Sequence, residues 1–283
     1  MSGPNRVQEP RRRLRWLLVV VGLCLLLPLA AAEPRKGKIS AVEQQAKLKE
    51  RNRLIAEGNK LLAAGKLGEA IADAEKVLAL AREVFGDKAA AVVESLQWLA
   101  NLHERGENFA AAGEKLREVR DIQTARYGKD HWRVLNARLD LADVELREKM
   151  SREQRQQVRE ANSLLGQASQ LNRQGKAREA LPLADKARRI RQDIYGVKHR
   201  HHATALNWVG ILYWSMGAYA KAETLYRQAL DIYKQALGDK HPDYATSMDN
   251  LALLYQSMGA YAKAEPLYRQ ALDIRKQVLG DKH

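Results

Sequence analysis

Apolar residues recur with helical spacing along most of the chain, and the pattern repeats. In residues 242–258, Met248, Leu251 and Tyr255 fall three or four residues apart, as on one face of an α-helix. Gly259 interrupts the pattern, and a second helix-spaced set of residues follows. That second helix is expected to turn these residues inward: Tyr261, Ala264, Tyr268, Ala271 and Leu272. The pattern predicts an all-α chain built from pairs of antiparallel helices.

A segment of the chain occurs twice in nearly identical form. Residues 217–234 match residues 259–276 almost letter for letter, 42 residues later. The same step separates two further sets of residues at the unit ends: His199, His241 and His283, and Gly196, Gly238 and Gly280. A glycine at the end of a helix tolerates the left-handed conformation that stops the helix. The repeat therefore predicts a solenoid of stacked helix pairs.

The repeated unit resembles the tetratricopeptide repeat (TPR). Its 42-residue period and the junction Leu-Gly-Asp-Lys-His-Pro-Asp-Tyr-Ala-Thr-Ser at 237–247 resemble the longer variant found in kinesin light chains and many bacterial repeat proteins. The resemblance implies a right-handed superhelical solenoid whose concave side binds other proteins. It is strongest over residues 199–283, and weaker units fit upstream around these ranges: 58–74, 96–112 and 164–187.

One unit departs from the period. His131 and His199 lie 68 residues apart, and residues 132–149 read as a first helix without its partner. The chain is expected to divide as follows: a leader at 1–32, a polar tether at 33–45, N-terminal units at 46–149 and C-terminal units at 150–283. The last unit ends where another repeat should begin, so a further unit is expected to cover one more set of residues: Leu267, Ile274 and Val278.

The N-terminus has the features of a secretory signal peptide. Residues 11–15 are Arg-Arg-Arg-Leu-Arg, and the apolar run 16–32 ends in small residues. Cleavage after Ala32 would place the mature chain in the periplasm or outside the cell. An uncleaved membrane anchor is the alternative, although 17 residues are short for a membrane span. The single cysteine, Cys24, lies in this leader, so no intrachain disulfide is expected.

The composition suits helices, and the charge suggests an acidic partner. Aromatic residues make up only 6% of the chain, while Ala and Leu dominate, which favours close-packed helices. The formal net charge is +14, and most of it lies outside the leader. A basic surface attracts acidic peptides, nucleic acid or anionic membranes. The densest basic segment, 186–191, lacks stacking aromatics, so nucleic-acid binding is not expected.

The sequence offers no catalytic constellation. It has neither a glycine-rich phosphate loop nor a nucleophile elbow, so neither an enzyme nor a cofactor is predicted. The run containing His199, His201 and His202 raises a metal hypothesis, because imidazoles bind zinc. One histidine belongs to every unit junction, however, and no carboxylate is placed beside these three. No metal site is therefore predicted, and Asp and Glu are interpreted as surface and capping residues.

The concave surface is the remaining candidate site. Its side chains come from first helices and include several asparagines, although Asn is unfavourable inside helices. An amide both donates and accepts hydrogen bonds, as a peptide backbone requires, and the resemblance implies the same role. The predicted groove residues are Asn101, Asn172, Asn207, Ile211, Trp214, Asp249, Leu253 and Gln256. The sequence thus predicts an exported, non-catalytic scaffold for a protein or peptide. The alternatives are a sensor region of a larger enzyme and a structural protein that self-associates.

Overall fold

The computed structural model describes residues 39–279, which form α-helices joined by short turns. Within this range the chain has eleven helices and no strand. Their bounds are α1 (Ala41–Ala63), α2 (Leu67–Phe85), α3 (Ala90–Arg105), α4 (Phe109–Tyr127), α5 (Trp132–Lys149), α6 (Arg152–Arg173), α7 (Ala177–Tyr195), α8 (Arg200–Ser215), α9 (Tyr219–Leu237), α10 (Pro242–Ser257) and α11 (Tyr261–Leu279). The prediction of an all-α chain is confirmed.

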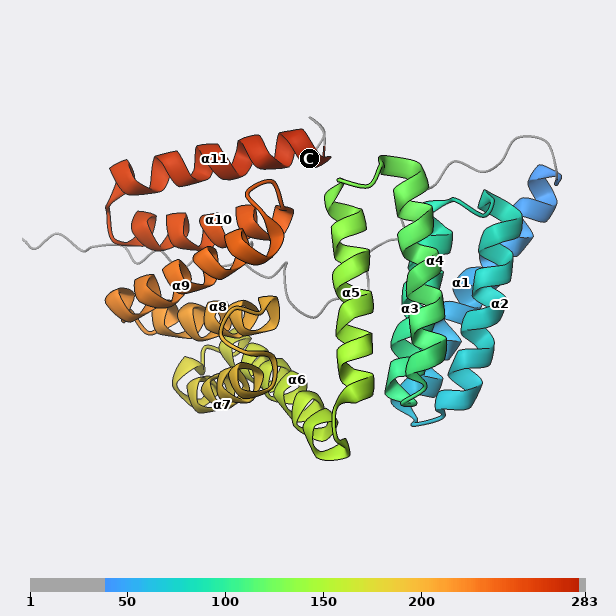
Figure 1. The fold of residues 1–283 in the computed structure, drawn as a ribbon, viewed down its shortest axis with the longest axis horizontal. Coiled ribbons are helices and arrows are strands. Elements are labelled where there is room, and N and C mark those ends of the chain that lie inside the picture. The colour runs from blue at the N-terminus through green and yellow to red at the C-terminus, as the bar shows by residue number, and fades with distance from the viewer. Residues whose placement is uncertain (1–38, 280–283) are drawn as a thin grey trace, which may run out of the picture.

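The helices pack in sequence as antiparallel pairs. We call α1, α3, α5, α6, α8 and α10 first helices, and α2, α4, α7, α9 and α11 second helices. Each second helix packs against the first helix before it, and α8 also contacts both α6 and α10. Figure 1 shows two groups of helices, α1–α5 and α6–α11, with α5 standing at the side that faces the second group.

Repeated residues start and end the helices. The imidazole Nδ1 atoms of His131, His199 and His241 each accept a hydrogen bond from the backbone N–H two residues later, at 3.1, 3.2 and 3.1 Å. These bonds satisfy one of the N–H groups that a helix start leaves free. At the other end, Gly196 and Gly238 have φ values of 85° and 84°, which glycine adopts without strain. The 42-residue marks are therefore helix boundaries.

Small residues let paired helices approach closely. Ala222 and Ala229 on α9 are fully buried, and Tyr226 between them is only 2% exposed. Tyr255 on α10 is equally buried, and it joins Ala222 and Tyr226 in one apolar cluster. The interior of the C-terminal group thus alternates alanines with large aromatic rings, as the sequence predicts.

Helix α5 lacks a second helix of its own. It packs against α4, and α6 begins after only two residues, Met150 and Ser151. The Ser151 side chain accepts from the N–H of Gln154, while the Gln154 side chain accepts from the N–H of Ser151. This capping box starts α6 immediately, leaving no room for a partner helix. The prediction of a lone first helix over 132–149 is confirmed.

The last helix differs from expectation. Tyr261 is 66% exposed and Leu272 is 45% exposed, whereas both were expected to face inward. Ile274 was expected to be uncovered but is only 6% exposed, because it packs into the cluster formed with Tyr233 and Met248. The register of α11 is therefore turned relative to the prediction, and Ile274 already has its contacts.

Several sequence expectations fall on the ends of the chain. The leader at 1–32, Gly280 and His283 lie outside the described residues. Helix α1 begins at Ala41, where the Ser40 side chain accepts a hydrogen bond from the Glu43 N–H at 3.2 Å. The stretch 33–45, expected to be a tether, therefore ends in helix. Between residues 39 and 279, no helix is both long and apolar enough to cross a membrane.

Candidate functional site

Most of the predicted groove residues lie on neighbouring first helices. Ile211 and Trp214 on α8 are partly buried, and so is Leu253 on the adjacent α10. Trp214 donates from Nε1 to the Ser257 hydroxyl at 2.9 Å, which ties its ring to α10. We call the surface around Ile211, Trp214 and Leu253 the groove face. It presents apolar area held in place by a hydrogen bond between two repeats.

The polar groove residues on these helices are largely engaged within the chain. Asp249 accepts a hydrogen bond from Arg275 of α11, and Gln256 accepts one from the Tyr268 hydroxyl at 3.1 Å. Asn207 is only 8% exposed, and its carbonyl oxygen has no hydrogen-bond partner among residues 39–279. A ligand oxygen or N–H would have to displace neighbours to reach that atom. The role predicted for Asn207 therefore stays a prediction.

The remaining two groove residues lie away from this surface in the fold. Asn101 is exposed on α3, in the N-terminal group, where it accepts a hydrogen bond from Arg105 at 3.1 Å. Asn172 is partly buried near the end of α6. The structure therefore brings together the predicted residues of α8 and α10, but it does not bring Asn101 beside them.

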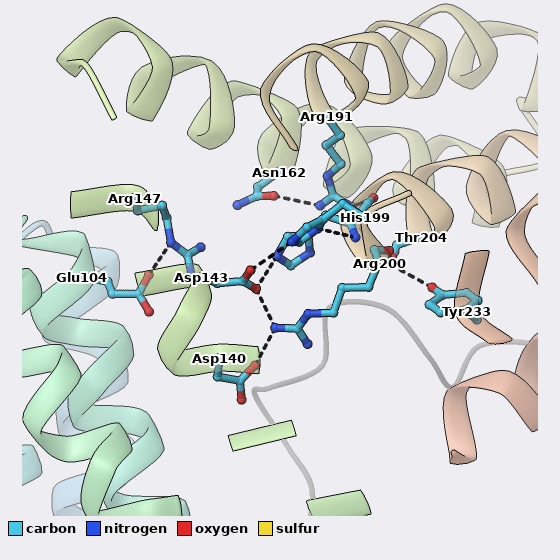
Figure 2. Close-up of polar contacts among 11 residues, drawn as sticks. Glu104, Asp140, Asp143, Arg147, Asn162, Arg191, His199, Arg200, Thr204 and Tyr233 are labelled. Carbon is cyan, nitrogen blue, oxygen red and sulfur yellow. Dashed lines mark hydrogen bonds and ion pairs between the residues drawn. The ribbon is translucent and has the colours of Figure 1, made fainter. Parts of the chain in front are cut away.

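A second polar site lies where α5 meets the start of α8 (Figure 2). Asp143 on α5 is only 3% exposed. Its carboxylate lies 2.7 Å from Nε2 of His201 and 3.3 Å from Nε2 of His199. Arg200 donates to the same carboxylate at 2.5 Å and to Asp140, one turn earlier on α5, at 2.8 Å. We call these five residues the α5–α8 junction.

The charges of the α5–α8 junction shift one another strongly. Burial alone would raise the pKa of Asp143, but hydrogen bonds from His199 and His201 hold it well below its usual range. Burial lowers the pKa of His201 to about 4, although Asp143 opposes that shift. Burial also raises the pKa of Asp140, with Arg200 opposing it. At neutral pH the junction therefore holds a carboxylate anion, a neutral His201 and a guanidinium.

Further bonds surround this junction. Arg147 of α5 lies 3.1 Å from the carboxylate of Glu104 on α3, and burial raises the pKa of Glu104 against the effect of Arg147. At the start of α10, Nε2 of His241 lies 3.0 Å from the Asn136 side-chain oxygen. Because the Nδ1 atom of His241 accepts its capping bond, Nε2 carries the proton in the neutral ring and donates to Asn136. Helix α5 thus contacts α3, α8 and α10 through polar groups.

One more bond ties this face of α5 to the last helix. The indole N–H of Trp132 donates to the backbone oxygen of Val278 at 3.3 Å. The lone helix α5 is therefore where the two groups of repeats meet. Its uncovered face is polar, which suits contact with helix ends rather than with a helix side.

Sequence reasoning identified the histidines but missed their partners. It named His199, His201 and His202, and the structure brings only the first two to Asp143; His202 is buried elsewhere. The interpretation of Asp and Glu as surface and capping residues is wrong for Asp143. A signal existed, because Asp140 and Asp143 are three residues apart and share a face of the lone helix. Nothing in the sequence indicated which element that face would meet.

The repeat geometry agrees with comparisons to known proteins. Family models described as tetratricopeptide repeat match residues 59–88, 159–235 and 201–277. This chain belongs to the tetratricopeptide repeat family. The matched TPR segments cover the helix pairs α6–α7, α8–α9 and α10–α11, together with part of α1–α2. The resemblance seen in the sequence is thus confirmed.

Solved structures similar to this TPR chain share little sequence with it. The kinesin light chain-type TPR-like repeats of Podosopora anserina are 18% identical, with a TM-score of 0.37 over 86% of this chain and 99% of that one. BtubC from P. vanneervenii is 17% identical, with a TM-score of 0.40 over 87% and 94%. A Rap protein complexed with Competence and Sporulation Factor is 16% identical, with a TM-score of 0.39 over 85% and 58%. No curated protein matches the chain significantly.

Proposed function

We propose that this TPR chain is an exported, non-catalytic scaffold that binds a protein or peptide partner on its groove face. TPR folds are generally protein-interaction scaffolds, which supports the coarse assignment. The observation that carries the proposal is the groove face itself. Ile211, Trp214 and Leu253 leave apolar side chains partly exposed on two adjacent first helices, beside amide and carboxylate groups. Tryptophan in such a setting often dominates a binding interface.

The charge of the chain supports an acidic partner. A net charge of +14 attracts anionic chains and speeds their encounter at low salt. On the groove face, Asp249 is already neutralised by Arg275, so it opposes an acidic partner less than a free carboxylate would. Export rests on the basic and apolar pattern of residues 1–32, which would deliver the scaffold to the periplasm or the cell exterior.

The test is affinity capture from the native compartment, followed by measurement of the captured partner's affinity for purified variants. Trp214→Ala is expected to weaken binding by about 2 kcal/mol, roughly thirtyfold, because it removes a central apolar contact. Leu253→Ala is expected to weaken binding to a smaller extent. The matched control is Leu272→Ala, which removes an exposed apolar side chain from a second helix instead. All three variants should keep their helical circular dichroism.

The salt dependence supplies an independent reading. Raising the salt from about 0.05 to 0.5 M should slow association with an acidic partner, because screening shortens electrostatic range. A partner bound equally by the parent, Trp214→Ala and Leu253→Ala, but lost with Leu272→Ala, would place binding on the second helices and overturn the proposal. A captured assembly made only of copies of this chain would favour a structural role instead.

A further inference from the structure

Three side chains with metal-binding atoms converge in the α5–α8 junction. The carboxylate of Asp143 and the Nε2 atoms of His199 and His201 all lie within 4.8 Å of one another. The histidines lie at the start of α8, and the carboxylate comes from α5, more than fifty residues earlier. We propose that these three residues bind a divalent transition-metal ion, with zinc as the best match, and that the ion ties α5 to α8.

The donor set matches zinc chemistry. Imidazole nitrogen and carboxylate oxygen are zinc ligands, and three protein ligands leave a fourth position for water or a partner side chain. Tetrahedral bonds of about 2.0–2.1 Å place neighbouring donor atoms about 3.3 Å apart. The observed separations from Asp143 are 2.7 Å to His201 and 3.3 Å to His199, so the site needs only a small opening of the His201 pair.

The surroundings hold the carboxylate in place. Asp143 is 3% exposed, and one of its oxygens accepts a hydrogen bond from Arg200, which Asp140 orients in turn. A hydrogen bond to the second oxygen of a ligating carboxylate is a common outer-shell arrangement in metal sites. The negative charge of Asp140 offsets the guanidinium, so Arg200 does not leave a net positive charge beside the ion.

The repeat explains only one member of the cluster. His131, His199 and His241 all cap a helix through Nδ1. Two residues after each cap the chain has Arg133, His201 and Asp243 respectively, so the second imidazole occurs at this junction alone among the three. The nearby carboxylate of Asp143 is likewise an addition to the repeat. Helix capping therefore accounts for His199, but it requires neither His201 nor Asp143.

Metal binding requires one rearrangement at His199. Its Nδ1 atom accepts from the His201 backbone N–H, so in the neutral ring the proton sits on Nε2. Coordination through Nε2 moves that proton to Nδ1 and ends the capping bond. One capping bond is weak compared with the bonds of a structural zinc ion, so the exchange favours the metal-bound form.

The test uses the full purified chain, stripped with chelator and titrated with ZnCl₂ by calorimetry. The parent is expected to bind one zinc ion and to melt at a higher temperature with zinc than without it. Cobalt(II) at the same site should give the visible absorption of a tetrahedral ion. His199→Asn is expected to weaken zinc binding at least tenfold, and His201→Gln and Asp143→Asn should do the same. No binding partner is needed, so the result is independent of the proposed function.

His241→Asn is the matched control. Asparagine replaces histidine as a good N-cap in both His199→Asn and His241→Asn, but only the former removes a ligand. The control should bind zinc like the parent. Zinc that raises the melting temperature of the parent and the control, but not of His199→Asn, supports the site. The absence of binding to the parent, or equal binding to the parent and His199→Asn, overturns it and leaves a purely hydrogen-bonded junction. If Asp143→Asn does not fold, His199→Asn and the cobalt spectrum still decide.

Discussion

Gly210 of α8 lies directly against the ring of Tyr226 on α9: a Cβ atom at Gly210 would be only 2.7 Å from Cε1 of Tyr226. Real Cβ atoms do not approach other atoms so closely, so this glycine sets the distance between the two helices. Tyr226 is 2% exposed and cannot move aside without disturbing Ala222 and Tyr255, which share its cluster.

Gly210→Ala is therefore expected to destabilise the chain by about 1–3 kcal/mol, although alanine is a better helix former. The control is Gly166→Ala on α6, where a Cβ would meet nothing within 4 Å. That change should stabilise the chain by about 0.5–1 kcal/mol. Urea denaturation of both variants provides the measurement. Equal gains from the two substitutions would show that α8 and α9 are not in close contact here.

The register of α11 makes a second prediction. Ile274→Ala should cost about 2–5 kcal/mol, because Ile274 is 6% exposed and packs against the cluster containing Tyr233 and Met248. Leu272→Ala, two residues earlier and 45% exposed, should change the unfolding free energy by less than about 0.5 kcal/mol. Thermal or urea unfolding of the two variants separates these outcomes. The reverse order of effects would return α11 to the register expected from the sequence.

A third prediction concerns pH and the partly buried Glu94 on α3. Burial raises the pKa of Glu94 above its ordinary value of 4.5, and the nearby charge of Arg51 only partly opposes this. The folded chain therefore holds the proton more tightly than the unfolded chain does. The stabilisation that protonation provides is present below about pH 4.5 and is lost as pH rises through the folded-state pKa.

Glu94→Gln removes this titration. Its unfolding free energy should rise relative to that of the parent between pH 4 and pH 7, as the parent loses the stabilisation of a protonated Glu94. Urea midpoints measured at each pH unit would show the trend. A difference between parent and variant that stays constant over this range would mean that Glu94 does not titrate abnormally.

The fourth prediction concerns the leader. If the pattern of residues 1–32 directs export with cleavage after Ala32, the protein recovered from outside the cytoplasm should begin at Glu33. N-terminal sequencing or intact-mass measurement checks this. Intact Met1 recovered in a membrane fraction would instead favour the uncleaved anchor, while a mature chain found only in the cytoplasm would contradict both readings.

The fold was largely predictable because its determinants are local and repeated. Caps such as His241, glycine ends such as Gly238 and buried alanines such as Ala222 act within one helix pair, so a 42-residue period reveals them. The α5–α8 junction depends instead on how far the chain turns after Ser151. That turn brings Asp143 to His201 across 58 positions, and no period encodes such a contact.

The groove face falls between these cases. Helical spacing placed Ile211, Trp214 and Leu253 on first helices, and the structure sets them near one another. Spacing could not show that Gln256 would meet Tyr268, or that the carbonyl oxygen of Asn207 would be buried, because these contacts depend on the side chains of neighbouring helices. Which of these residues meet a partner is decided by the binding measurements described above.

The lone helix α5 also has a consequence for how the chain unfolds. Apolar clusters join α2 to α5 on one side and α6 to α11 on the other, and Leu139 is the α5 residue that packs against the second set. Most bridges between the two sides are hydrogen bonds and ion pairs, which couple neighbours more weakly than shared apolar area does. Amide hydrogen exchange should therefore reveal two cooperative blocks that open separately, with α5 protected together with the N-terminal block.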